Sequence, residues 1–343
     1  MEYRKGTYVI TGVTGMIGGF LAATLLDSQE CRQGDIQVVG LVRDGSRLGG
    51  KLRTAPQCFR FIECDFCAAD FRWDSLLDQL PSSADYLIHC AAPTASSYMV
   101  SHPVETADSI LFGTRNMLEL ARRIRAKSMV YLSSMEVYGR TADRGEPLEE
   151  AELGYVPLDS VRSCYPLGKT MGEHYCHIYQ QEYGVPVKIA RLAQVFGKGV
   201  RPEDNRVYMQ FAKAVLGKRN IVLRTEGSSM GNYCASEDAA AAVFSILDRG
   251  EDGEVYNVVN EGNAMTIREM AELVAGEVAN GAIGVEIRAE DARAYGYAPA
   301  TQLRMSGKKL RELGWRPTKG LAEMYLDVIY ELEKAGYAAG DVR

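Results

Sequence analysis

Three glycines at three-residue spacing near the N-terminus constrain the fold of this chain more than any other feature. The run Thr11-Gly12-Val13-Thr14-Gly15-Met16-Ile17-Gly18 lies between an apolar stretch, Tyr8–Ile10, and a helical stretch, Phe20–Leu26. Glycine lacks a Cβ, so it can turn tightly and let a phosphate approach the backbone. The unpaired N–H groups at the start of the following helix attract a pyrophosphate. The order of strand, glycines and helix therefore predicts a dinucleotide-binding turn formed by Gly12, Thr14, Gly15, Met16, Ile17 and Gly18.

Strand-like apolar runs alternate with helical patterns through the first half of the chain. This alternation predicts an α/β fold of the Rossmann type, in which a doubly wound parallel sheet carries helices on both faces. Ligands bind such sheets beyond the carboxyl ends of the strands, where the strand order reverses. The predicted strands are Tyr8–Ile10, Gln37–Val42, Phe59–Glu63, Tyr86–Cys90, Met129–Leu132 and Val187–Leu192, and the predicted helices include Phe20–Leu26, Trp73–Leu80, Val104–Arg123 and Pro166–Tyr183.

The pattern changes after Gly197, where a loop-like stretch and shorter elements follow. The alanine-rich segment Ser236–Leu247 is predicted to be a helix that returns to the first domain. Thr266 and Glu269 form a capping box, which predicts a helix start. We predict a dinucleotide-binding domain at 1–192 plus about 233–260, a smaller interleaved substrate-binding domain at 193–232 plus 261–316, and a closing helix and tail at 317–343.

Length and composition exclude several classes of protein. The 343 residues are 46% hydrophobic with a formal net charge of -6, which gives no general attraction to nucleic acid or anionic membranes. No apolar stretch is long enough to span a bilayer, and the start lacks an apolar signal core, so we expect a cytoplasmic protein. The eight cysteines are scattered and are expected to be reduced thiols. Cys64 and Cys67 have no second pair, so we expect no metal site.

A tyrosine and a lysine in the run Tyr165-Pro166-Leu167-Gly168-Lys169 are the second candidate for chemistry. Pro166 can start a helix, and residues four apart on a helix share one face. The ammonium of Lys169 is therefore expected to lower the pKa of the Tyr165 phenol toward neutrality. Such a phenolate can take a proton from an alcohol while hydride leaves the same carbon.

The end of the fifth predicted strand is the third candidate, because its polar residues emerge at the carboxyl edge of the sheet. Ser134 is expected to donate a hydrogen bond to the substrate oxygen, and Glu136 adds a carboxylate to the same cleft. The alternative for Glu136 is a solvated loop acid. The predicted catalytic residues are Ser134, Glu136, Tyr165 and Lys169, and the predicted substrate contacts are Thr94, Ser134, Met135, Glu136, Gln194 and Arg206.

The end of the second predicted strand bears on the choice of cofactor. An acid there accepts from the ribose hydroxyls of NAD, whereas an arginine accommodates the extra phosphate of NADP. Arg43 and Asp44 both follow the strand, so we expect NAD or NADP, with Arg43 modestly favouring NADP. An ordinary solvated charge pair is the alternative. Further expected cofactor contacts are Asp65, Phe66, Ala91, Ala92, Tyr165 and Lys169.

Together these motifs resemble the extended short-chain dehydrogenases/reductases, specifically the NAD-dependent epimerase/dehydratase family that acts on nucleotide sugars. The resemblance covers nearly the whole chain and includes His89-Cys90-Ala91-Ala92, Gly113-Thr114, Asp238 and Leu313-Gly314-Trp315. It implies a nicotinamide in the large domain and a nucleotide-diphosphate sugar in the small one. It also implies that the sugar is oxidised at C4, changed and then reduced again. A homodimer is implied through the helices at 104–123 and 166–183.

The resemblance leaves the reaction open. The Ser-x-Glu-Val-Tyr-Gly form resembles the 4,6-dehydratases and the uronic-acid decarboxylases of the family. In one dehydratase branch an aspartate protonates the departing hydroxyl, and here that position is Met135, which cannot donate a proton. We therefore rank epimerisation of a nucleotide sugar first, decarboxylation of a nucleotide-linked uronic acid second and 4,6-dehydration third. An NADPH-dependent carbonyl reductase and a non-enzymatic nicotinamide-responsive binding protein remain alternatives.

The chain departs from the family pattern at three positions. The family usually has asparagine where this chain has Ile110 and Gln194, and a diphosphate-clamping arginine where it has Gly231. A glycine offers only backbone to a phosphate. Either another cation substitutes or the substrate is not a nucleotide-diphosphate sugar. We favour substitution, because Asp204-Asn205-Arg206 leads into the predicted substrate helix. The candidate cations are Arg201, Arg206 and Arg224, and Arg206 is the predicted substrate contact.

Overall fold

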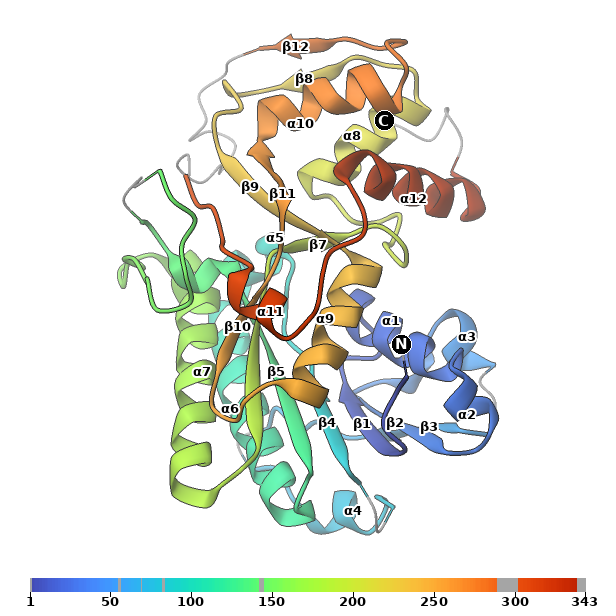
Figure 1. Ribbon diagram of the computed structural model, residues 1–343, viewed down its shortest axis with the longest axis vertical. Coiled ribbons are helices and arrows are strands. Elements are labelled where there is room, and N and C mark those ends of the chain that lie inside the picture. Colours follow the sequence, from blue (N-terminus) through green and yellow to red (C-terminus); the bar gives the residue numbers. More distant parts are fainter. Residues whose placement is uncertain are drawn as a thin grey trace.

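Seven parallel strands form the central sheet of the computed structural model, which describes residues 2–54, 57–68, 70–81, 84–141, 145–288 and 302–337 (Figure 1). The strand order is β10-β6-β5-β4-β1-β2-β3. The chain direction across the sheet reverses between β1 and β4, so the switch point of a doubly wound sheet lies there. The strands are β1 (Gly6–Thr11), β2 (Ile36–Val42), β3 (Phe59–Glu63), β4 (Tyr86–His89), β5 (Ser128–Ser134), β6 (Val187–Leu192) and β10 (Val255–Val258).

Helices cover both faces of this sheet, which confirms the predicted fold. Tyr8 and Ile10 of β1 pack in one core cluster with Leu21 of α1 and with α9. Val9 points to the opposite face and packs in a second cluster with Met117 of α6 and with α7. This alternation is the two-residue period of a strand. The helices of this unit are α1 (Met16–Leu26), α2 (Gln29–Arg32), α3 (Gly50–Arg53), α4 (Asp74–Leu77), α5 (Ser96–Ser101), α6 (Pro103–Ile124), α7 (Cys164–Tyr183) and α9 (Ser236–Arg249), with short 3₁₀ turns η1 (Gly45–Arg47), η2 (Met135–Tyr138) and η3 (Val161–Ser163).

A second, smaller unit lies beyond the carboxyl edge of the sheet, at the top of Figure 1. Its core contains stacked rings of Phe196 and Tyr208, whose centroids are 4.3 Å apart. Thr266 begins α10 through the predicted capping box, in which both hydrogen bonds with Glu269 are present. The elements are β7 (Gln194–Phe196), β9 (Met230–Ala235) and β11 (Asn260–Thr266) in one sheet, β8 (Ile221–Leu223) and β12 (Val285–Ile287) in another, and α8 (Val207–Leu216), α10 (Ile267–Leu273), the π-turn η4 (Val274–Val278) and α12 (Leu321–Lys334).

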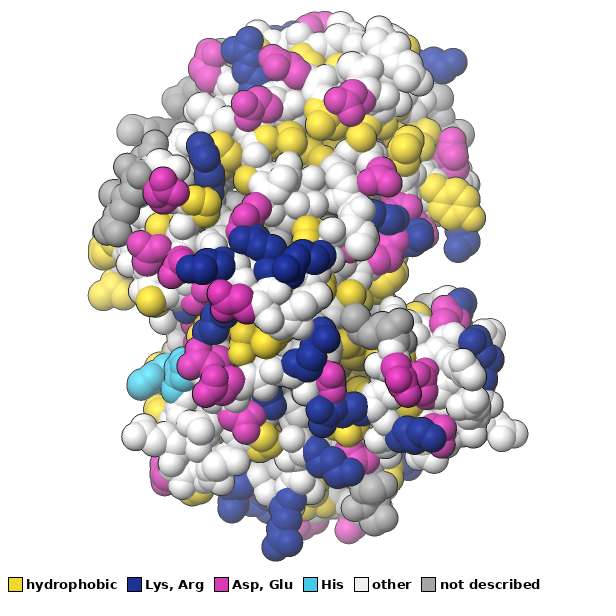
Figure 2. Space-filling view, viewed as in Figure 1, with side chains coloured by type: hydrophobic (Ala, Val, Ile, Leu, Met, Phe, Trp, Pro, Cys, Tyr) yellow, Lys and Arg dark blue, Asp and Glu magenta, His cyan; other side chains and the backbone are white. Residues whose placement is uncertain are grey.

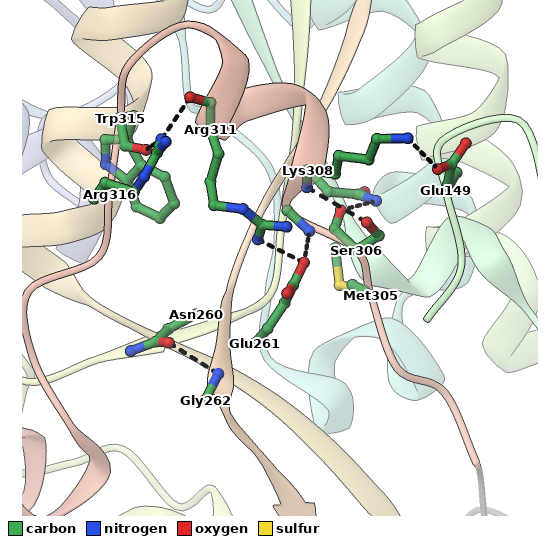
Figure 3. Close-up of polar contacts among 12 residues, drawn as sticks. Glu149, Asn260, Glu261, Gly262, Met305, Ser306, Lys308, Arg311, Trp315 and Arg316 are labelled. Atoms are coloured by element: carbon green, nitrogen blue, oxygen red, sulfur yellow. Dashed lines mark hydrogen bonds and ion pairs between the residues drawn. The ribbon is translucent and has the colours of Figure 1, made fainter. Parts of the chain in front are cut away.

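Residues 302–316 pack on the large unit. Met305 and Trp315 belong to the same core cluster as β1 and α9. Figure 3 shows Lys308 of α11 (Lys308–Glu312) paired with Glu149 at 3.4 Å, and Arg311 paired with Glu261 of β11 at 2.7 Å. Through these two ion pairs the segment is connected both to the loop that contains Glu149 and to β11. The predicted substrate-binding domain included residues 302–316, whereas in the structure these residues pack on the large unit.

Two cysteines depart from the prediction of reduced thiols. Cys31 in α2 and Cys58, directly before β3, form a disulfide, so the prediction is wrong for this pair. The two lie 27 residues apart in sequence, and only the packing of α2 beside the start of β3 brings them together. The other six cysteines are free.

The surface carries charges of both signs. Figure 2 shows Lys and Arg side chains interspersed with Asp and Glu on the viewed face, and a notch on the right between the small unit and the part of the large unit that holds β1 to β3. Among the residues that the structure describes, no helix combines the length and apolar character that crossing a membrane requires.

Candidate active site

The glycine-rich turn joins β1 to α1 at the switch point of the sheet. Gly12 has φ +71°, and a Cβ there would lie 3.0 Å from the backbone nitrogen of Ala91. A Cβ on Gly18 would collide with the carbonyl of Gly12. The first turn of α1 carries no acidic residue, and no side chain caps its start at Gly15. The turn therefore forms a close backbone cradle at a helix N-terminus, which fits the pyrophosphate of a dinucleotide.

Thr11, the last residue of β1, holds this cradle to the end of β4. Its Oγ1 accepts from the backbone N–H groups of Cys90 and Ala91 at 3.0 and 3.1 Å, and it lies 2.8 Å from Nδ1 of His89. Because the hydroxyl already accepts two bonds, its own proton goes to Nδ1, which places the ring proton on Nε2. Burial, followed by the charge of Lys169, lowers the pKa of His89 to about 3. The neutral ring thus accepts from the Thr11 hydroxyl, and that hydroxyl fixes Ala91 beside the cradle.

Tyr165 and Lys169 lie in the first turns of α7, beside the end of β5. The helix begins at Cys164, two residues before the predicted start at Pro166. Lys169 is 3% exposed and donates from Nζ to the carbonyl oxygen of Leu132 at 2.7 Å. Its Nζ lies 6.0 Å from the ring centroid of Tyr165, and Tyr165 forms a hydrogen bond with Ser134. The structure thus brings Ser134, Tyr165 and Lys169 together at the carboxyl edge.

The pKa of Tyr165 differs in direction from the prediction. Burial raises it above the usual value of a phenol, and the negative charge of Glu136 raises it further. The hydrogen bond with Ser134 and the positive charge of Arg162 lower it only in part. Burial also lowers the pKa of Lys169, to about 8. The expected lowering of the phenol pKa is therefore wrong for the protein by itself, because desolvation outweighs the nearby cations.

A buried ion pair holds α7 against the sheet. Glu173 of α7 accepts from Nε and Nη2 of Arg191, on β6, at 2.9 and 2.7 Å. Their side chains are 5% and 4% exposed, respectively. Ser133 Oγ of β5 donates to Glu173 Oε1 at 2.5 Å. Since Glu173 lies one turn beyond Lys169 and Ser133 precedes Ser134, these contacts fix the two segments that carry the candidate catalytic residues relative to each other.

Glu136 is paired with an arginine that the sequence analysis did not select. Arg162, in η3 directly before α7, donates from Nη2 to Glu136 Oε1 at 2.9 Å. Its Cζ lies 5.9 Å from the ring centroid of Tyr165. Nη1 of Arg162 is buried and has no hydrogen-bond partner within the described part of the chain. Its position three residues before Tyr165 was the sequence feature that could have identified it, since residues three apart are neighbours on a helix.

The residues expected to contact the ribose and adenine form local hydrogen bonds at the ends of β2 and β3. Asp44 Oδ1 accepts from the backbone N–H and hydroxyl of Ser46 at 2.9 and 2.6 Å, and so caps η1. Asp65 Oδ1 accepts from the backbone N–H of Cys67 at 3.2 Å. Arg43 is exposed. Among the other predicted contacts Phe66 is buried, Thr94 is exposed, and Ala92, Met135 and Gln194 are partly exposed.

Two arginines of the loop between β7 and α8 approach the large unit. Arg206 pairs with Asp204 at 2.5 Å and donates to the hydroxyl of Tyr208 at 3.0 Å. Its charge partly opposes the rise in the pKa of Tyr165, so it acts on the same group of candidate catalytic residues. Arg201 donates from Nη2 to the carbonyl oxygen of Thr14 in the glycine-rich turn. The small unit therefore presents positive charge to both the candidate catalytic residues and the cradle.

Gly231, the position where an arginine was expected from the resemblance, lies in β9. A Cβ on this glycine would collide with the ring of Tyr233. The hydroxyl of Tyr233 is itself buried without a hydrogen-bond partner among the described residues. The local packing thus excludes a larger side chain at 231, and any cation for a substrate diphosphate has to come from another element.

Comparisons with known proteins identify the family and the fold. The model of the NAD dependent epimerase/dehydratase family matches residues 8–259. UDP-glucuronic acid decarboxylase 3 of Arabidopsis thaliana is 27% identical, and the match covers 92% of this chain and 85% of that protein. The structure of UDP-glucose 4-epimerase from Thermotoga maritima has a TM-score of 0.78 at 21% identity, covering 96% of this chain and 99% of that one. UDP-glucuronic acid 4-epimerase from Bacillus cereus, solved with UDP-glucuronic acid and NAD, has a TM-score of 0.75 at 20% identity over the same shares of the two chains.

Proposed function

Because this chain belongs to the NAD-dependent epimerase/dehydratase family, we propose that it oxidises C4 of a nucleotide-linked uronic acid and releases the C6 carboxylate as carbon dioxide. The observation that carries the proposal is the buried, unpartnered Nη1 of Arg162 beside Tyr165. A guanidinium N–H is a strong donor to a carboxylate. The similarity to a UDP-glucuronic acid decarboxylase over most of the chain supports the same substrate class.

The cradle of Gly12, Gly15 and Gly18 with the start of α1 would hold the dinucleotide, and Ala91 and Ala92 would border its nicotinamide end. When bound, the nicotinamide supplies a reversible hydride acceptor and, in its oxidised form, a positive charge. Whether the dinucleotide is NAD or NADP depends on Arg43, which is exposed. Measuring the affinity for NAD and NADP before and after Arg43→Ala decides the choice, and an unchanged preference removes Arg43 from the argument.

Tyr165 takes the proton of the C4 hydroxyl, and Ser134 forms a hydrogen bond with the same oxygen. Burial raises the pKa of Tyr165, so its phenolate form depends on neighbouring positive charge. Lys169 supplies such charge below about pH 8, the value to which burial lowers its pKa. Arg162 supplies it at every working pH, because a guanidinium does not lose its proton.

Oxidation makes the substrate a β-keto acid, since the C4 carbonyl then lies two carbons from the carboxylate. The C5–C6 bond breaks, carbon dioxide leaves, and the electron pair of that bond moves into the C4 carbonyl. C5 then takes a proton, which the partly exposed carboxylate of Glu136 can relay from solvent, and C4 is reduced again. No acid is needed at Met135, because no hydroxyl departs. Epimerisation, ranked first from sequence, shares the ketone. With a neutral sugar it gives the unpartnered donor of Arg162 no role, whereas with a uronic acid it would use the same donor, and the mass of the product separates the two reactions.

The test is incubation with UDP-, GDP-, CDP- and dTDP-linked glucuronic acids and the matching neutral sugars, with product masses measured. We expect loss of carbon dioxide from one of the uronic acids. Arg162→Met should lower its turnover at least about tenfold, the effect of losing one charge-assisted hydrogen bond. Arg60→Met is the matched control, because Arg60 donates to the carbonyl of Gln79 at the far edge of the sheet.

Other products contradict decarboxylation in distinguishable ways. An unchanged mass with altered chromatography indicates epimerisation, and loss of water indicates a dehydratase. A readily exchanged NADPH with no turnover of any nucleotide sugar indicates the carbonyl reductase alternative.

A further inference from the structure

Arg201 crosses from the small unit to the glycine-rich turn of the large one. Its Nη2 donates to the carbonyl oxygen of Thr14, which lies 187 positions away in the sequence. This is the one hydrogen bond that its side chain forms with the described residues, and the side chain is otherwise exposed. A guanidinium has five N–H donors, so most of its hydrogen-bonding capacity is available to a ligand at the turn.

The backbone around Arg201 is held in place. Its carbonyl oxygen accepts from the backbone N–H of Asp204 at 3.0 Å, and Lys213 Nζ donates to the carbonyl oxygen of Pro202 at 2.7 Å. Val200 is buried in the core of the small unit. A Cβ on Gly199, which has φ +79°, would lie 3.3 Å from the ring of Phe20 on α1. The loop is therefore seated directly on the helix whose start forms the cradle.

The acceptor that Arg201 uses here is a neutral carbonyl. A phosphate oxygen is a stronger acceptor for a guanidinium, because the hydrogen bond is then charge-assisted on both sides. The cradle otherwise offers backbone N–H groups and the positive end of α1, whose first turn has no charged residue. A helix end carries only a partial positive charge, so one guanidinium adds a comparable or larger contribution.

We propose that Arg201 binds the diphosphate of the nicotinamide dinucleotide and so clamps the small unit onto the cofactor. From the sequence alone, Arg201 is a candidate substitute for the arginine missing at 231, on the side of the substrate. Its contact with Thr14 assigns it to the dinucleotide instead. The inference requires only a dinucleotide at the turn, so it holds or fails independently of the decarboxylation proposed above.

The experiment compares Arg201→Gln with the unchanged full-length chain in the binding of NAD, ADP-ribose, adenosine and UDP by isothermal titration calorimetry. ADP-ribose keeps the diphosphate without the nicotinamide, and adenosine lacks both. We expect affinities for NAD and ADP-ribose to fall at least about tenfold. Adenosine and UDP should bind as before. The salt dependence of ADP-ribose binding should also become shallower, because one cation fewer contacts the phosphates.

Lys198→Gln is the matched control, because Lys198 lies in the same loop but pairs with Glu237 at 2.8 Å. It should leave all four affinities unchanged. Unaltered binding of ADP-ribose to Arg201→Gln overturns the proposal. An equal loss for adenosine also overturns it, because Arg201 would then only support the shape of the turn. A loss confined to UDP overturns it in favour of a substrate-diphosphate contact.

Discussion

The carboxyl edge of the large sheet and the facing loop of the small unit (residues 197–206) hold their charges in different ways. At the edge, Lys169 and the pair of Glu173 and Arg191 are buried and bonded to protein groups. In the loop, Arg201 and Arg206 are exposed or partly exposed, and they bond to a carbonyl and to Asp204. The buried charges at the edge cannot leave their partners without disturbing the fold. In the loop, a ligand anion can replace the protein group to which each arginine is bonded. We therefore expect the chemistry to depend on the edge and ligand recognition to depend on the loop.

The largest effect is expected at the edge, from Tyr165→Phe. The variant keeps the ring that packs beside Met99 and Ile110 but lacks the hydroxyl that we propose takes the proton. Turnover should fall by about 10²–10⁴-fold, the usual contribution of a positioned acid/base group. Nucleotide-sugar binding and thermal stability should change little. Retention of full turnover would show that another group takes the proton.

A second prediction at the edge concerns stability. Glu173→Gln leaves Arg191 buried without its counter-ion, so we expect the free energy of unfolding to fall by about 3–5 kcal/mol. Denaturant titration measures it. Glu182→Gln, near the exposed end of the same helix, is the control and should change stability by at most about 0.5 kcal/mol. Similar losses in both variants would mean that the buried pair has no special part in holding α7.

The same contrast explains what the sequence could predict. The strands, the glycine-rich turn and the Tyr165–Lys169 pair follow from local periods and spacings. The hydrogen bonds of Arg162 with Glu136, 26 residues away, and of Arg201 with Thr14 arise only from tertiary packing. The pKa of Tyr165 was predicted in the wrong direction because spacing reveals a neighbouring ammonium but not the extent of burial. Sequence patterns therefore predicted which residues lie at the carboxyl edge of the sheet, but they did not predict the tertiary contacts that these residues make.

A third, smaller effect is a pH dependence at Lys169. Burial lowers its pKa to about 8, whereas the unfolded chain keeps this proton until about pH 10.5. Between these values the unfolded chain binds more protons, so the contribution of Lys169 to the free energy of unfolding rises with pH. The cost of burying the ammonium is fully present below about pH 8. Turnover should change in the opposite sense and fall as pH rises through about 8.

Lys169→Met supplies the comparison for this prediction. The free energy of unfolding of both proteins is measured by denaturant titration at pH 7 and pH 9.5. The difference between the unchanged chain and Lys169→Met should move in favour of the unchanged chain at the higher pH. Parallel changes in the two proteins would indicate that other groups dominate the pH dependence.

The smallest effect is expected in the loop, from Arg206→Ala. If Arg206 takes over the substrate diphosphate from the missing arginine at 231, its loss should weaken nucleotide-diphosphate binding by at least about 1.5 kcal/mol, or about tenfold. Calorimetric titration with UDP measures it. Asp204→Asn is the matched control, because it removes the partner of Arg206 but leaves the guanidinium in place. That variant should bind UDP as well as the unchanged chain or better, since the cation no longer has to exchange partners. Equal weakening in both variants would mean that the ion pair only shapes the start of α8. Arg201 would then be the remaining support for the view that the charges of the loop, unlike those of the edge, can change partners.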